Sequence, residues 1–236
     1  MKNLKISVLA IAFLIGMTSC HREGIIRDNF SNEEAAELVS NAIQNATDGI
    51  SEQLSDMTQY VTETIADNFE CGVTIDSSFT KTVQKVRVSA EYDVAWDWTP
   101  TCNDLDNMIA LDYNGVLTGG YTGLRASSEE TKTTSLTITG MQLASAVLTY
   151  DGSSLNEGTQ TVTVKETKNI SSKLTMSMTG ITVDKIETEI SDGDISFELL
   201  VVVDGGDPIT FTGTVEFLGS RDANITINGE TFLVDL

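Results

Sequence analysis

Alternation of apolar and polar side chains with a period of two constrains the fold of this chain more than any other feature. Between residues 86 and 98, the even-numbered positions hold Val86, Val88, Ala90, Tyr92, Val94, Trp96 and Trp98. The odd-numbered positions of the same segment are mostly charged. This pattern is typical of an antiparallel strand that has one buried face and one face in water.

Turn signals divide the rest of the chain into many short segments. Asn-Gly or Asp-Gly pairs occur at 114–115, 151–152, 192–193, 204–205 and 228–229. Because such pairs favour two-residue hairpins, we predict that sequential strands are antiparallel neighbours in a β-meander. The expected strands, after 86–98, lie near 107–113, 115–125, 131–139, 141–150, 159–167, 172–179, 181–190, 195–203, 208–218, 222–227 and 230–236. We also expect Pro100 to end the first strand and 127–130 to form a turn.

A helical segment is predicted before the strands. Ser31 and Glu34 fit a capping box, and apolar residues then recur at three- and four-residue steps from Val39 to Ile65. Thr47-Asp48-Gly49 is expected to split the helix. We expect the segment 31–70 to pack its apolar stripe on the sheet; a coiled coil with a partner protein is the alternative.

The predicted fold is mainly β with an N-terminal α-helical segment. A meander of so many strands curls, splits or closes. We therefore expect residues 71–236 to form one antiparallel β domain, as a curved sheet, a sandwich or a partly open barrel, with the helix packed on it.

The N-terminus predicts export and lipidation. Lys2 and Lys5 precede an apolar stretch over 4–17, which is shorter than the roughly 20 residues of a membrane span. Met17-Thr18-Ser19-Cys20 resembles a bacterial lipobox, and its relaxed form is similar to that of lipoproteins of the Bacteroidota. The alternative is an ordinary secreted protein.

The lipobox resemblance implies how the chain is anchored. Residues 1–19 would be a signal peptide, and Cys20 would carry diacylglycerol and acyl chains such as palmitate at the head of a tether, 20–30. The partner of the chain would then be a membrane, to which this lipid attaches the protein. Because His21 and not Asp follows Cys20, we expect the outer membrane, with the periplasmic face slightly preferred over the surface.

Cys71 and Cys102 are the cysteines that remain once Cys20 is acylated. An even pair in an oxidising envelope predicts a disulfide. Reduced thiols and a metal site are the alternatives, although the sequence places no histidine near them to complete a zinc shell.

Composition argues against several function classes. The chain has 35 acidic against 14 basic residues, a net charge of −21, so nucleic acid and anionic headgroups are poor partners. Its one histidine is His21 beside the anchor, which leaves no proton shuttle for a Ser-His-Asp hydrolase. No phosphate-binding or dinucleotide-binding glycine pattern appears. We therefore expect no enzyme activity, no cofactor and no metal. The segments Asp192–Asp194 and Asp204–Asp207 offer oxygen ligands that could suit calcium, but we interpret them as turns.

Three functions follow from these features. The first is a lipid-anchored envelope protein with a structural or interaction role. The second is a carrier of an apolar ligand, held in a cavity of the curved sheet. The third is a carbohydrate-binding module that stacks sugar on Trp96 and Trp98, although these indoles share their face with core residues and are expected to be core.

Overall fold

The computed structural model describes residues 30–68, 70–142, 144–164, 166–219 and 221–236. The predicted signal peptide, Cys20 and nearly all of the predicted tether lie outside the described residues.

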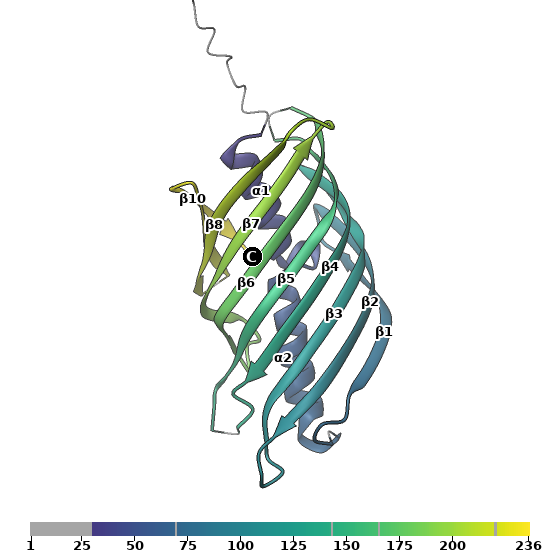
Figure 1. Cartoon of the computed structure of the whole chain (residues 1–236), viewed down its shortest axis with the longest axis vertical. Helices are drawn as coiled ribbons and strands as arrows, with labels where there is room; N and C mark the ends of the chain where they lie inside the picture. Colours follow the sequence, from purple (N-terminus) through teal and green to yellow (C-terminus); the bar gives the residue numbers. More distant parts are fainter. Residues whose placement is uncertain (1–29, 69, 143, 165, 220) are drawn as a thin grey trace, which may run out of the picture.

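The body is a curved antiparallel sheet of ten strands (Figure 1). The strands are β1 (Ile75–Gln84), β2 (Val88–Cys102), β3 (Met108–Gly123), β4 (Ala126–Thr139), β5 (Val147–Val162), β6 (Lys168–Asp184), β7 (Ile190–Val203), β8 (Pro208–Gly219), β9 (Asp222–Ile227) and β10 (Glu230–Asp235). Each strand pairs with the next in sequence order. Within the described residues β1 and β10 do not pair with each other, so the sheet stays open. The predicted β-meander with helices packed on it is confirmed.

Two helices precede the sheet and are separated by a short break. They are α1 (Asn32–Ile43) and α2 (Ile50–Asn68), with the single 3-10 turn η1 (Asn45–Thr47) between them. The predicted capping box is present: the Ser31 backbone N–H donates to Glu34 Oε2 at 2.8 Å, and the Glu34 N–H donates to Ser31 Oγ at 3.3 Å. The break falls where the sequence predicted it.

The helices run across one face of the sheet (Figure 1). α1 contacts β9 and β10, and α2 contacts β6 and β7. The helix residues that are buried along the predicted stripe are Val39, Ile43, Ile50, Leu54, Met57 and Val61. Because burying each large aliphatic side chain contributes about 1.5–3 kcal/mol, this stripe holds the helices on the sheet of their own chain.

Several predicted turns are wrong because the strands are longer than their turn-like residues suggest. β3 runs through Asn114-Gly115, β4 includes 127–130, and β7 includes Asp192-Gly193. At Gly115 an added Cβ would lie 2.1 Å from the Tyr113 hydroxyl oxygen, so this glycine makes room for an aromatic ring inside the strand. At Asn114-Gly115 the glycine therefore serves packing within a strand and not a hairpin.

β5 also continues through a predicted turn, at Asp151-Gly152. The register with β6 shifts between Tyr150 and Gly152, and Gly152 has φ 152°. An added Cβ there would lie 2.2 Å from the carbonyl oxygen of Ser135. The pair therefore marks a β-bulge, which bends a long strand without ending it.

Pro100 does not end β2, which runs on to Cys102. The carbonyl of Pro100 accepts a hydrogen bond from the Gly72 N–H at 2.8 Å, on the side of β2 away from β3. In an antiparallel strand the N–H of a residue points to the same side as its carbonyl. The missing N–H of Pro100 therefore faces the side where β1 has already ended, at the Ile75–Trp98 pair, and no ladder bond with β3 is lost.

Buried tyrosines predict a loss of stability at alkaline pH. Burial raises the pKa of Tyr92, Tyr113, Tyr121 and Tyr150 above the ordinary value. An unfolded chain releases these protons from about pH 10 upward while the folded chain keeps them, so the free energy of unfolding must fall as pH rises beyond that point. Urea midpoints should drop between pH 8 and 11, and Tyr150→Phe should show a smaller drop; an equal drop in both chains would contradict the role of Tyr150.

Candidate functional site

The structure contains the predicted disulfide between Cys71 and Cys102, with the two Cα atoms 5.7 Å apart. Cys71 lies in the connection from α2 to β1, and Cys102 is the last residue of β2. The bond therefore fixes the end of the helical segment to the strand that carries both tryptophans.

Trp96 and Trp98 lie on the inner face of β2 and line one cavity. Trp96 is half-buried and Trp98 is only 2 % exposed. The cavity has a volume of about 400 Å³ and lies between α2 and strands β1 to β3. Its apolar lining consists of Met57, Tyr60, Phe79, Val94, Trp96, Trp98, Tyr113 and Leu117. The indoles that the sequence singled out are therefore parts of a concave wall.

Four aromatic rings form a continuous array in this wall. The ring centre of Tyr60 on α2 lies 5.3 Å from that of Trp96 and 5.5 Å from that of Trp98. Tyr113 on β3 lies 4.6 Å from Trp98. These separations are within the favourable range for aromatic pairs, so the rings hold one another in place and connect the helix to the sheet.

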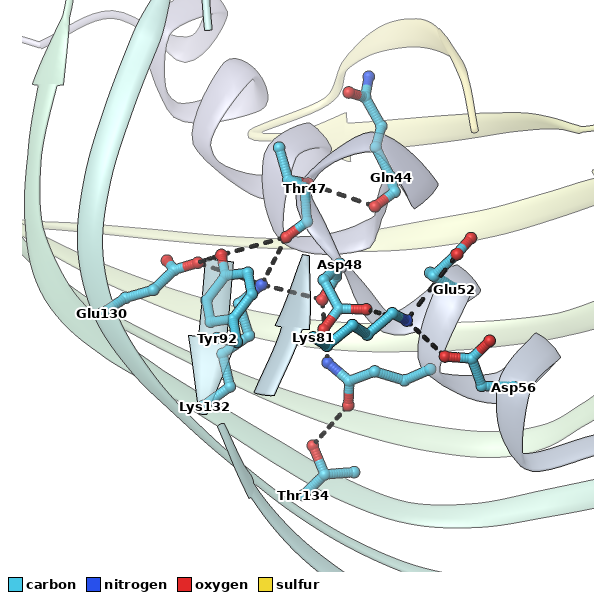
Figure 2. Close-up of polar contacts among 11 residues, drawn as sticks. Gln44, Thr47, Asp48, Glu52, Asp56, Lys81, Tyr92, Glu130, Lys132 and Thr134 are labelled. Carbon is cyan, nitrogen blue, oxygen red and sulfur yellow. Dashed lines mark hydrogen bonds and ion pairs between the residues drawn. The ribbon is translucent and has the colours of Figure 1, made fainter. Parts of the chain in front are cut away.

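The other part of the cavity lining is polar, and half of its residues are acidic: it consists of Asp48, Gln53, Asp56, Gln59, Glu63 and Lys81. Figure 2 shows Lys81 of β1 between three carboxylates. Its Nζ lies 2.7 Å from Asp48 Oδ1 and 3.8 Å from Glu52 Oε1, and it also contacts Asp56. One ammonium thus faces three acids.

The pKa values of this cluster reflect burial and crowding of negative charge. Burial lowers the pKa of Lys81, but the neighbouring Asp48 and Asp56 outweigh it and the net shift is upward. Burial raises the pKa of Glu52; Lys81 opposes this rise, whereas Asp56 and Asp48 add to it. Lys81 is therefore held as an ammonium.

A second buried lysine fixes the backbone at Asp48. Lys132 of β4 donates from Nζ to the carbonyl oxygens of Thr47 and Asp48, both at 2.9 Å, and lies 3.1 Å from Glu130 Oε1 (Figure 2). The Tyr92 hydroxyl donates to the same Glu130 oxygen at 2.7 Å. A helix end leaves backbone carbonyls without intrahelical partners. Lys132 therefore supplies the hydrogen-bond donor for the carbonyls of Thr47 and Asp48 at the break between α1 and α2.

The break itself needs an unusual backbone. Asp48 has a left-handed conformation, with φ 52°, and a Cβ added at Gly49 would lie 2.5 Å from the backbone of Ile43. Gln53 at the start of α2 donates to the Asp48 carbonyl at 3.1 Å. The position of the Asp48 carboxylate in the cavity wall is therefore set by the turn, by Gln53 and by Lys132.

Two buried polar atoms on residues of the cavity wall have no hydrogen-bond partner among the described residues. They are Oδ2 of Asp48, which is 1 % exposed, and the indole nitrogen Nε1 of Trp98. One is an acceptor and the other a donor. Leaving such groups unsatisfied costs about 1–3 kcal/mol each, and an unpaired buried group calls for an explanation such as a binding role.

Sequence reasoning missed Lys132, Glu130 and Lys81. The segment 127–130 was interpreted as a turn, and β1 was not predicted as a strand. The sequence did contain a pattern that could have indicated them. Alternate residues of a strand share one face, so in a continuous β4 the side chains of Glu130 and Lys132 lie on the same inner face as Leu136 and Ile138.

Within the described ranges, no group of three or more His, Cys, Asp or Glu residues is placed to hold a metal ion. Asp192 and Asp194 lie inside β7, and Asp204 is in the turn after it.

In the part of the chain that the structure describes, neither helix is long and apolar enough to cross a membrane. Comparisons with models of protein families, with curated proteins and with solved structures found no match for this chain.

Proposed function

We propose that this chain is a lipid-anchored, non-catalytic protein of the cell envelope that binds a small, largely apolar ligand in the cavity between α2 and β1 to β3. The observation that carries the proposal is an aromatic cavity of about 400 Å³ whose other side carries a few polar and charged side chains, among them Asp56, Glu63 and Lys81. Ligand sites typically occupy about 300–1,000 Å³ and combine apolar walls with a few polar groups.

The chemistry of the lining supports binding over catalysis. Its described residues include no His, Cys, Ser or Thr, so it offers neither the usual proton shuttle nor an aliphatic hydroxyl or thiol nucleophile. Lys81 is held as an ammonium between carboxylates, which removes it as a nucleophile.

The geometry favours a ligand held in this half-enclosed cavity over the two other functions considered from the sequence. Sugar stacking on an open platform needs both indoles at the surface, and Trp98 is buried. A purely structural or interaction role would require nothing of the cavity and would leave it without a ligand.

A neutral apolar dye tests the proposal. Nile red, whose emission rises in apolar surroundings, should bind saturably at one dye per chain. Phe79→Ala, which truncates a half-exposed ring in the cavity lining on edge strand β1, should weaken binding about five- to tenfold. Leu233→Ala truncates an exposed apolar side chain on the opposite edge strand, β10, and should leave binding unchanged. Equal effects of the two substitutions, or no saturable binding, would contradict a ligand site here.

The lipid anchor has a separate test. Cys20→Ser should move the protein from the membrane fraction to the soluble fraction of the envelope and should remove the acyl mass, because the thiol is the predicted attachment point. Mass spectrometry of the intact protein measures this. Retention of Cys20→Ser in the membrane, or an unmodified Cys20 in the native chain, would contradict lipidation.

A further inference from the structure

The charges of the cavity lining favour a positively charged ligand over a negatively charged one. The charged residues of the lining are Asp48, Asp56, Glu63 and Lys81, so three acids stand against one base. Glu52, next to Lys81, adds a fourth carboxylate. An anionic ligand would therefore meet like charge at close range in a half-enclosed site, where charges are poorly screened.

The aromatic wall adds a second attraction for positive charge. Tyr60, Trp96, Trp98 and Tyr113 present electron-rich rings within one cavity. A cation within about 6 Å of such a ring face is attracted by the quadrupole, most strongly by Trp. The same chain already uses this contact at Lys132, whose Nζ lies 4.4 Å from the ring centre of Tyr92.

The carboxylates of the lining distinguish among cations. Asp48 is buried and pairs with Lys81 through Oδ1, so its negative charge acts on a ligand without direct contact. The carboxylates of Asp56 and Glu63 belong to the same lining and are exposed, so they can accept an N–H from a ligand, and a charged N–H makes the stronger hydrogen bond.

We propose that the ligand of this cavity is an organic cation, a protonated amine whose apolar body lies against the aromatic wall and whose ammonium group faces the acidic side of the lining, which carries Asp48, Asp56 and Glu63. This inference rests on the proposed function, because it names the class of ligand for the same cavity. Lys81 neutralises part of the acidic cluster and leaves the remainder for the amine.

Three probes of nearly equal size separate charge from apolar contact. They are 2-phenylethylamine, a cation at neutral pH, 2-phenylethanol, which is uncharged, and phenylacetate, an anion. Binding is measured by calorimetry and by indole emission, which reports directly on the cavity because Trp96 and Trp98 are the two tryptophans of the chain. We expect the amine to bind at least about tenfold more tightly than the alcohol, and phenylacetate to bind most weakly.

Two substitutions test the acidic residues. Asp48→Asn should weaken amine binding by at least about tenfold and leave alcohol binding nearly unchanged. Since Asp48 also pairs with Lys81, Glu63→Gln in the exposed part of the lining provides a milder variant, with an expected loss of a few-fold for the amine alone. Glu216→Gln, an exposed acid on β8 outside the cavity lining, is the matched control and should change nothing.

The outcomes separate this inference from the proposed function. Equal binding of amine and alcohol, or tighter binding of phenylacetate, would overturn the cation inference while the cavity remained a ligand site. Loss of amine affinity in Glu216→Gln equal to that in Glu63→Gln would also overturn it, because the effect would then be one of net charge. Failure of all three probes together with failure of Nile red would overturn both proposals.

Discussion

Replacing Lys132 with Met is expected to lower the free energy of unfolding by about 3–5 kcal/mol, because the substitution leaves Glu130 as an unpaired charge in the core. The side chains of Lys132 and Glu130 are each 3 % exposed. The substitution also removes the donor to the carbonyls of Thr47 and Asp48. Urea denaturation of the two chains measures the difference.

The outer face of the same sheet offers a matched control. Lys173 and Glu157 form an ion pair at 2.9 Å, but both side chains are about half exposed. Lys173→Met should therefore cost no more than about 1 kcal/mol. Equal losses in Lys132→Met and Lys173→Met would contradict the view that burial makes the inner pair indispensable.

A double variant shows how much of the stability lost in Lys132→Met comes from the unpaired charge of Glu130. Lys132→Met with Glu130→Gln removes both charges, so we expect it to recover most of the stability lost in Lys132→Met. A residual loss of about 1 kcal/mol should remain, since the carbonyls at the helix break still lack their donor. A double variant less stable than Lys132→Met would show that the break, and not the charge, dominates.

Reduction of the disulfide is the second large effect expected. Cys71 and Cys102 are 31 residues apart, and closing a loop of this size stabilises the folded state by roughly 3–4 kcal/mol in the chain-entropy model. The urea midpoint of the Cys20→Ser chain should fall by the corresponding amount when reducing agent is added.

The control for reduction is the same chain with both Cys71 and Cys102 replaced by Ser. It should start at the lower midpoint and should not respond to reducing agent. An unchanged midpoint of the parent chain, together with two titratable thiols, would contradict the disulfide.

Local chemistry in the sequence predicted the parts of the fold that depend on neighbouring residues. The capping box at Ser31, the helix break at Thr47–Gly49 and the alternation over 88–98 all depend on such local patterns. The turns at Asp204-Gly205 and Asn228-Gly229 were also predicted correctly, since the chain there reverses between two strands. These features need no knowledge of distant contacts.

Strand length could not be predicted in the same way. Asn114-Gly115 and Asp151-Gly152 have the chemistry of hairpin turns, and only the positions of Tyr113 and of the neighbouring strand show why Gly is needed there. β1 was missed because most of its side chains are exposed, so that its sequence lacks an apolar face.

The site was predicted in part. Trp96 and Trp98 follow from the alternation of β2, but Tyr60 comes from a helix and Tyr113 from the next strand, and their proximity depends on strand register and helix packing. The unpaired oxygen of Asp48 depends on a left-handed residue held by a lysine far away in sequence.

The central claim is that the cavity lined by Trp96 and Trp98 holds a ligand. Its most direct test compares the native and denatured masses of the Cys20→Ser chain, purified without detergent from the envelope of a bacterium of the group whose leaders this one resembles. We predict a reproducible excess mass that is lost on denaturation and reduced in Phe79→Ala but not in Leu233→Ala. Native and denatured masses that agree in all three chains would contradict the claim.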